Sequence, residues 1–199
     1  MYTRLLTFTG ATDIDAGVQY LANEVMPILE AQKGFRGVSA SADRAASVLT
    51  ILSIWETEAD RSASDSALGK ARDEAMERVG GTLEIENFEE AVQSIVQPPA
   101  MGCRLNVVRI RMEPASIDAN IEWFKDQVLP QISAQPGFCA LRNMVDRQTG
   151  KALTGSVFVD RESADASMAN MPARRSGAEA RGITFEDISQ REILLSVIK

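Results

Sequence analysis

Residues 25–35 read VMPILEAQKGF, and residues 128–138 read VLPQISAQPGF. The two stretches lie 103 positions apart and share Val, Pro, Ala, Gln, Gly and Phe in register. In both, a proline interrupts a helical pattern that a Gly-Phe pair then ends. Glycine readily takes the left-handed conformation that terminates a helix, and an apolar residue after it can pack back on the helix end. Each stretch therefore predicts a bent helix that stops and leads into a strand.

An amphipathic helix leads into each copy. Apolar residues recur three or four positions apart, as one buried helix face requires, at Ile14, Val18, Leu21, Val25 and Leu29, and again at Ile117, Ile121, Phe124, Val128 and Ile132. Asp13 and Ser116 stand just before these stripes. We predict both as N-caps, because a side-chain oxygen can accept from the first free backbone amides of a helix. The chain is thus an internal repeat of two similar units.

The remaining pattern of the first repeat predicts the order β-α-β-β-α-β. Its strands are expected at residues 5–9, 36–42, 47–55 and 83–92, and its helices at 14–32 and 60–79. The run 48–55 is almost continuously apolar and β-branched, which predicts a central strand covered on both faces. The second repeat predicts strands 105–112, 138–145, 152–159 and 191–198 and a helix at 117–135. Its second helix, near 163–171, is expected to be shorter or broken because Pro172 follows.

Only one clear linker separates the repeats, the stretch 97–102, which begins Gln97-Pro98-Pro99. We therefore divide the chain into a first repeat at residues 1–96, the linker at 97–102 and a second repeat at 103–199. At 199 residues the length fits two units of about 100 residues each. The two units are expected to share a core.

Composition and charge exclude several classes of partner. The net charge is −7, and neither half has the concentrated basic face that binding to a phosphate backbone needs, so we expect no nucleic-acid partner. No stretch approaches the roughly 20 apolar residues that span a bilayer, so we expect no membrane partner. Two cysteines, Cys103 and Cys139, do not make a disulfide framework. We expect a cytoplasmic protein.

Two motifs resemble a known family. The phrase P-h-h-x-x-x-x-G-F (h, apolar) after an amphipathic helix, together with Trp55-Glu56-Thr57-Glu58-Ala59 at the end of the third strand, resembles the antibiotic biosynthesis monooxygenase-like family of the dimeric α/β-barrel superfamily. The likeness covers nearly the whole chain, once per repeat. It implies an α+β fold of two tandem ferredoxin-like βαββαβ units that form an intrachain pseudo-dimeric α/β barrel. Such a protein can act as a monomeric pseudo-dimer or as a homodimer.

The resemblance also implies site residues. In this family a tryptophan at the end of the third strand and a polar residue on the first strand line the cavity; Trp55 matches the former and Asn106, in the other repeat, matches the latter. Haem degraders of the family add a histidine, and this chain has no histidine. Phe158 stands where the second repeat would need its tryptophan. The resemblance thus implies cofactor-free oxidation, with no cofactor and no metal, and Trp55 and Asn106 as catalytic candidates.

Further residues are candidates for substrate binding. Tyr20 and Trp123 occupy equivalent positions on the two bent helices and either seal the core or line a cavity. Arg109 and Arg111 share a strand face, and with Arg174 and Arg175 they either hold an anionic ligand or form a solvated surface. Phe158 is a further candidate for substrate binding. The structural alternative is packing for Trp55 and a hydrogen bond to a backbone group for Asn106.

Two functions follow from these features. The first is a cofactor-independent monooxygenase-like protein that acts on or binds a small aromatic or quinone-type molecule, with arginines that stabilise its anionic form. The second is a non-catalytic small-molecule-binding or structural module of the same fold, because neither repeat carries a complete motif set. The absence of histidine also excludes a Ser-His-Asp triad and a histidine metal site, and no glycine-rich loop offers a phosphate cradle.

Overall fold

The computed structural model describes all residues from Met1 to Lys199. The chain folds into two compact units, and each is made mainly from one repeat. Unit 1 contains Met1–Asn87 and the C-terminal residues Ile193–Lys199, and unit 2 contains Phe88–Glu192. No helix is both long and apolar enough to cross a membrane.

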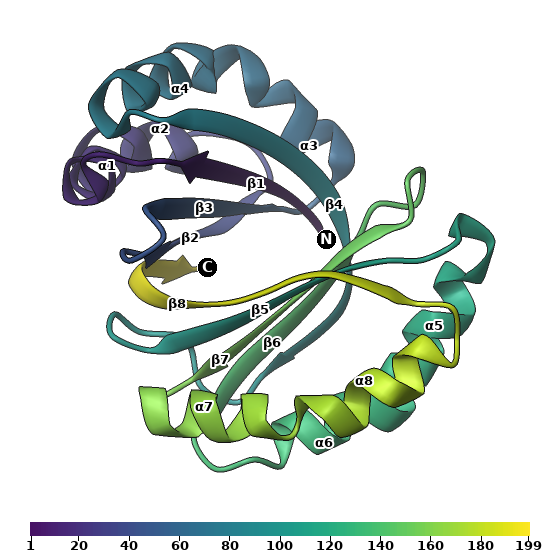
Figure 1. Ribbon diagram of the computed structural model, residues 1–199. Helices are drawn as coiled ribbons and strands as arrows, with labels where there is room; N and C mark the ends of the chain where they lie inside the picture. Colours follow the sequence, from purple (N-terminus) through teal and green to yellow (C-terminus); the bar gives the residue numbers. More distant parts are fainter. The chain divides into compact units, whose positions relative to one another are not determined.

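Unit 1 has the predicted β-α-β-β-α-β order. Its elements are β1 (Tyr2–Thr9), α1 (Ile14–Tyr20), the π-helical turn η1 (Leu21–Val25), α2 (Met26–Glu30), β2 (Phe35–Asp43), β3 (Val48–Trp55), α3 (Glu58–Ala63), α4 (Asp65–Val79) and the first half of β4 (Thr82–Ile95). Strand β3 pairs with both β1 and β2 and is buried along most of its length. The predicted central strand is therefore confirmed. Helices α1 to α4 cover one face of these strands (Figure 1).

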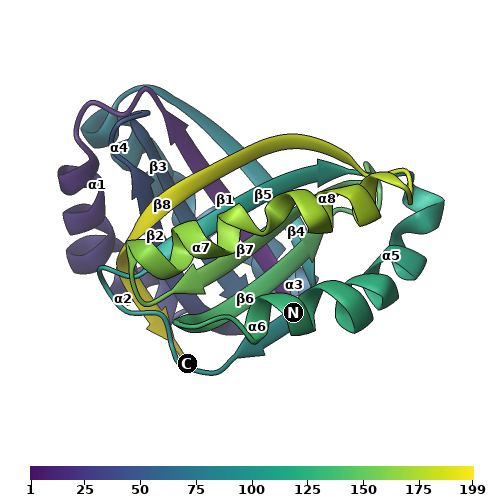
Figure 2. The same ribbon diagram turned by 60° about the horizontal axis from the view of Figure 1, so that its bottom comes forward.

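Unit 2 repeats the pattern. Its elements are β5 (Arg104–Arg111), the 3-10 turn η2 (Pro114–Ser116), α5 (Ile117–Trp123), the π-helical turn η3 (Phe124–Val128), α6 (Leu129–Ser133), β6 (Phe138–Val145), β7 (Lys151–Phe158), α7 (Arg161–Ala169), α8 (Met171–Glu179) and the first part of β8 (Thr184–Ile198). Helices α5 to α8 lie against one face of β5, β6 and β7 (Figure 2).

Two long strands, β4 and β8, each begin in one unit and end in the other. β4 continues past the predicted end at residue 92 and pairs with β6 over Glu89–Ile95, while β8 begins at Thr184, pairs first with β5 and ends beside β2. Gly37 permits that last approach, because a Cβ there would lie 2.6 Å from the Val197 carbonyl oxygen. The strand order β1-β3-β2-β8-β5-β7-β6-β4 closes as a barrel. Two tandem ferredoxin-like units in an α/β barrel, as predicted, are confirmed.

The compact units do not coincide with the predicted sequence ranges. The division at residues 97–102 follows the repeat in the sequence, whereas the units divide inside β4 and β8. A sequence repeat locates duplicated elements, but it does not say which sheet receives the end of a long strand. The ranges 1–96 and 103–199 therefore remain a description of the repeat.

The shared proline marks a π-helical turn in both bent helices. The Met26 N–H donates to the Leu21 carbonyl and the Leu129 N–H donates to the Phe124 carbonyl, each five residues back. Pro27 and Pro130 then occupy the first turns of α2 and α6, where a missing N–H is tolerated. Gly34 and Gly137 end the helices with φ of +72° and +74°. The predicted interruption and stop are both confirmed.

Local expectations for three helices need correction. Asp13 caps α1 as predicted, by accepting from the Ala16 N–H at 2.9 Å, but Ser116 does not cap α5; its hydroxyl donates to the Glu113 carbonyl instead. The helix predicted at 60–79 is two helices that meet at the buried Ser64. The second helix of unit 2 is broken at Asn170 as expected, yet it extends to Glu179 because Pro172 can start α8.

Candidate ligand-binding site

A cavity lies between the sheet of unit 2 and the helices that cover it. Its space is about 790 Å³ when the open solvent at its mouth is included. Three residues of β5, Asn106, Val108 and Ile110, and Met112 just after the strand form part of its floor. Side chains alternate across a strand, so Arg109 is directed to the other face and does not line the cavity. Because side chains alternate along β5, Asn106 lines the cavity and Arg109 does not.

The walls of the cavity are mostly apolar. Trp123, Phe124 and Val128 come from α5 and η3, and the π-helical turn sets their positions along the helix face. Met168 and Met171 come from α7 and α8, and methionine adapts to ligands of different outline. The Arg181 guanidinium lies 5.3 Å from the centre of the Trp123 ring and holds that ring from its outer side. The cavity therefore offers an aromatic wall to a planar apolar molecule.

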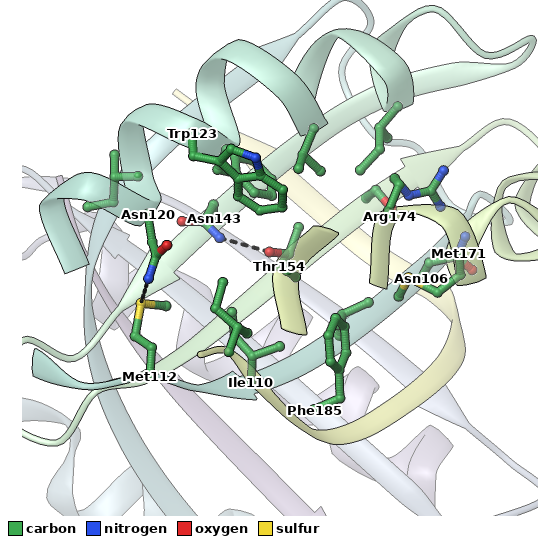
Figure 3. A pocket seen from close by; sticks show the side chains of 18 of the residues that line it. Asn106, Ile110, Met112, Asn120, Trp123, Asn143, Thr154, Met171, Arg174 and Phe185 are labelled. Carbon is green, nitrogen blue, oxygen red and sulfur yellow. Dashed lines mark hydrogen bonds between the residues drawn. The ribbon is translucent and has the colours of Figure 1, made fainter. Parts of the chain in front are cut away.

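Polar groups are few and mostly paired with one another. Asn143 donates to the Thr154 hydroxyl oxygen at 2.8 Å across neighbouring strands of the floor. Asn120 donates to Ser116, contacts the Met112 sulfur and accepts from the Arg181 Nε at 2.8 Å. Figure 3 shows the Asn143–Thr154 pair in the middle of the cavity and Asn120 with Met112 at one end. These groups hold the floor and one end in fixed positions.

Asn106 differs from the other amides because half of its side chain is unpaired. It is 2% exposed, and its Nδ2 donates to the Ala164 carbonyl of α7 at 3.0 Å. Its Oδ1 is buried and accepts no hydrogen bond from the protein. Buried polar atoms are almost always paired, so this oxygen, on a residue that lines the cavity, is an acceptor that lacks a protein donor.

Arg174 is the one ionisable residue in the cavity lining. Its Nη2 donates to the Ser167 carbonyl at 2.7 Å, and no carboxylate pairs with it. Burial lowers the pKa of its guanidinium from the ordinary value, but arginine retains its charge in proteins. A half-buried positive charge with unused donors and no counter-ion is therefore directed at an otherwise apolar space.

Unit 1 contains the corresponding cavity, whose space is about 550 Å³ when the open solvent at its mouth is included. Tyr2 pairs with Trp55 as Arg104 pairs with Phe158, so Arg4 on β1 holds the position of Asn106 on β5. Arg4 donates to the Arg61 carbonyl at 2.7 Å and to the Ser64 hydroxyl at 2.9 Å, and it forms an ion pair with Asp65 at 2.9 Å. Arg4 thus has a carboxylate partner in its own unit, which it shares with Arg72 at 2.6 Å.

The structure brings three of the seven predicted site residues together. Asn106, Trp123 and Arg174 line the unit 2 cavity, whereas Tyr20 lines the unit 1 cavity. Burial and a hydrogen bond to Glu74, 2.8 Å away, raise the pKa of Tyr20 to about 12. The four arginines do not gather in one rim, because Arg111 pairs with Glu186 and Arg175 pairs with Glu179.

Trp55 and Phe158 line neither cavity. Trp55 is fully buried, donates its indole N–H to the Ser53 hydroxyl at 3.0 Å and packs edge-on against Phe35, with ring centres 5.6 Å apart. Phe158 packs in the same way against Phe138 at 6.0 Å. The roles predicted for Trp55 and Phe158 remain predictions, and neither side chain lines a cavity.

Sequence reasoning missed several residues of the site. Asn120, Asn143 and Thr154 line the cavity, and positions 103 earlier hold Gly17, Ala40 and Ile51. Arg174 has Ala71 at its matching position, and Met168 has Asp65. Asn120, Asn143 and Thr154 could have been found by searching the second repeat for polar residues that replace Gly, Ala or Ile of the first. The prediction relied instead on the residues that the two repeats share.

Curated relatives place the chain in a family. It is 32% identical over 159 residues to the uncharacterized protein Rv2557 of Mycobacterium tuberculosis, which covers 79% of this chain and 71% of the relative. It is 27% identical over 192 residues to the uncharacterized protein Rv2558 of the same organism, covering 94% and 80% of the two chains. No protein-family model matches the chain.

Solved structures share the fold at low sequence identity. A candidate monooxygenase from Fusobacterium nucleatum has a TM-score of 0.73 at 13% identity and covers 100% of this chain and 94% of its own. An anthrone oxidase-like protein has a TM-score of 0.70 at 13% identity, with 99% and 92% covered. A ferredoxin-fold protein from Listeria monocytogenes, related to antibiotic biosynthesis monooxygenases, has 0.53 at 13%, with 96% and 93% covered. The chain therefore belongs to the family of Rv2557 and has the fold of the monooxygenase-related ferredoxin-fold proteins that its sequence resembles.

Proposed function

We propose that unit 2 binds a small planar aromatic or quinone-type molecule in its anionic form and oxidises it with dioxygen, without a cofactor. The observation that carries this proposal is Arg174, a guanidinium without a carboxylate partner at the edge of an apolar cavity. A positive charge in such surroundings favours a nearby anion more than it does in water. A phenolate or an aromatic carboxylate fits this requirement, with its ring against Trp123.

The electrostatic effect of Arg174 also supplies what oxidation of a phenol needs. No side chain with the pKa of a general base lines the cavity, so the phenolate must be favoured by charge rather than by proton abstraction. The electron-rich phenolate then gives electrons to dioxygen. For a phenol with a free para position, one oxygen atom enters the ring as the new carbonyl and the other leaves as water, giving a quinone. Atoms and electrons balance without another reductant.

The monooxygenase and oxidase names of the structural neighbours agree with this reaction class. Those likenesses concern the fold, so the chemistry rests on the cavity of unit 2. Solvent exclusion by the helices strengthens the interaction of Arg174 with the anion.

The first experiment compares Arg174→Ala with Arg161→Ala. Arg161 is an exposed arginine at the start of α7 that does not line the cavity. We expect Arg174→Ala to weaken the binding of naphtholate and naphthoate probes about tenfold or more, as loss of a charge-assisted hydrogen bond implies, and Arg161→Ala to leave it unchanged. Calorimetric titration measures both. Equal affinities in the two variants would overturn the proposal.

Turnover is tested by oxygen consumption with a panel of phenols and anthrone-type compounds, using metal-free protein. The predicted catalytic role of Trp55 is tested in the same assay, in which Trp55→Phe should lower turnover if the indole contributes and leave it unchanged if it only packs against Phe35.

One observation favours a second function, binding without turnover. The cavity of unit 2 lacks any residue that can exchange a proton near neutral pH, which suits a carrier or sensor of an aromatic anion as well as an enzyme. Tight binding by the wild type without oxygen consumption on any panel compound would favour this alternative.

A further inference from the structure

We infer that the ligand of the unit 2 cavity carries a hydrogen-bond donor, a hydroxyl or a ring N–H, close to its anionic oxygen but not internally bonded to it. This inference rests on the proposed function and sharpens its ligand class. The observation behind it is the Oδ1 of Asn106, a buried acceptor to which no protein group donates.

The orientation of the Asn106 amide is fixed by its surroundings. Its Nδ2 donates to the Ala164 carbonyl at 3.0 Å, and the reverse orientation would set two oxygens against each other. Oδ1 therefore stays on the side of the amide away from the Ala164 carbonyl. In unit 1 the matching side chain, Arg4, carries only donors, which are used by the Arg61 carbonyl, the Ser64 hydroxyl and Asp65. An unpaired acceptor at this position is thus specific to unit 2.

The open acceptor lies near the charge that binds the anion. Asn106 donates to Ala164 and Arg174 donates to Ser167, two carbonyls of the same helix α7. Three residues along an α-helix correspond to about 4.5 Å, so the two carbonyls that anchor these side chains lie within one turn of α7. Figure 3 shows Asn106 and Arg174 at the same end of the cavity.

Arg174 and the Asn106 Oδ1 would bind different chemical groups of a ligand. Arg174 has only donors and needs an anionic oxygen, while the Asn106 Oδ1 has only lone pairs and needs an O–H or N–H. A ring that bears an anionic oxygen and a meta-placed hydroxyl satisfies both. An ortho hydroxyl is less suitable, because it donates to the neighbouring anion of its own molecule. A site that hydrogen-bonds a substrate group discriminates strongly against analogues without it, since its buried polar atom is then left unpaired.

The test compares benzoate with 2-hydroxybenzoate and 3-hydroxybenzoate on the wild-type protein, by calorimetric or NMR titration. We expect 3-hydroxybenzoate to bind about tenfold more tightly than benzoate, as one hydrogen bond to a buried acceptor implies, and 2-hydroxybenzoate to gain less. Asn106→Leu should remove the advantage of the meta hydroxyl. The same substitution at the exposed Asn23 serves as the control.

The outcomes separate this inference from the proposed function. Equal binding of benzoate and 3-hydroxybenzoate by the wild type would overturn the donor requirement while leaving the anion site intact. Failure of all three acids and of the naphthoate probes to bind would overturn the anion site, and the donor requirement with it. The wild-type comparison decides the matter even if Asn106→Leu does not fold.

Discussion

Both cavities of this protein have an arginine in their lining, but its charge is balanced differently in each. In unit 1, Arg4 extends from β1 and is held by Asp65, Ser64 and the Arg61 carbonyl. In unit 2, the strand position holds Asn106, and Arg174 enters from α8 with one carbonyl contact and no carboxylate. The first arrangement completes a core, whereas the second leaves charge and hydrogen-bonding capacity for a ligand.

The comparison shows how one duplicated framework can serve two purposes. Several apolar wall positions recur in both cavities; Leu21 matches Phe124 and Leu29 matches Ile132 in the repeat. What differs is a small set of positions where unit 1 is either apolar or internally paired. Packing is thus the common property of the repeat, and the proposed binding depends on the positions that have diverged.

The largest effect is expected where unit 1 is internally balanced. Arg4 is 3% exposed, so Arg4→Ala removes two hydrogen bonds, an ion pair and a packed side chain together. We expect a loss of about 3 kcal/mol in the free energy of unfolding, measured by urea denaturation. Ligand affinity at unit 2 should not change.

Arg72→Ala is the control for Arg4, because Arg72 pairs with the same Asp65 at 2.6 Å from a more exposed position. It should cost under about 1 kcal/mol, as partly exposed ion pairs do. Equal losses in the two variants would show that Arg4 is an ordinary surface charge and would remove the contrast between the cavities.

A medium effect is expected from copying the charge balance of unit 1 into unit 2. Met168 lines the unit 2 cavity at the position of Asp65, so Met168→Asp supplies Arg174 with a carboxylate. We expect affinity for aromatic anions to fall about tenfold, or about 1.4 kcal/mol, while a neutral probe such as naphthalene binds as before. Met168→Asn, of similar size without the charge, is the control in fluorescence titrations. Equal loss from both variants would point to a steric cause.

The smallest effect concerns the matched aromatics Tyr20 and Trp123. Burial, then the hydrogen bond to Glu74, raises the pKa of Tyr20 to about 12, above its unfolded value of about 10. The folded protein therefore keeps a proton that the unfolded chain loses, so this contribution to stability is complete below pH ~10 and is lost as pH rises toward 12.

Tyr20→Phe should lack this dependence on pH. Thermal melts from pH 9 to 12 measure the difference in Tm between the two proteins. As the pH rises across that range, the Tm of the wild type should fall relative to that of Tyr20→Phe. Parallel curves would mean that Tyr20 titrates as an exposed phenol. Trp123, at the matching position, has no ionisable group, so this pH dependence belongs to unit 1 alone.

Much of the fold followed from residues that recur in register. The Pro-to-Gly-Phe phrase located both helix interruptions and both helix ends, because proline and glycine constrain the backbone locally. The long apolar run at 48–55 located the central strand. The N-cap predicted at Ser116 was wrong, because the Ser116 hydroxyl donates to the Glu113 carbonyl in the 3-10 turn before α5. Local signals thus predicted elements well and their exact ends less well.

The site was predicted less completely for a physical reason. Asn106, Trp123 and Arg174 were selected individually, but Arg109 and Trp55 were selected by the same kinds of argument and line neither cavity. The strand pleat decides that Arg109 is directed away from Asn106, and edge-on packing with Phe35 buries Trp55. Such outcomes depend on which face of a strand the helices cover.

The sequence by itself determined the duplication, the order of elements and the interruption in each bent helix, because these depend on backbone constraints and on the spacing of apolar residues. Only the tertiary structure decided that β4 and β8 each end in the other unit. It alone decided that Arg4 is balanced by Asp65 while Arg174 is left without a carboxylate. Charge balance is set by neighbours in space, and residues such as Arg4 and Asp65 lie 61 positions apart in the chain.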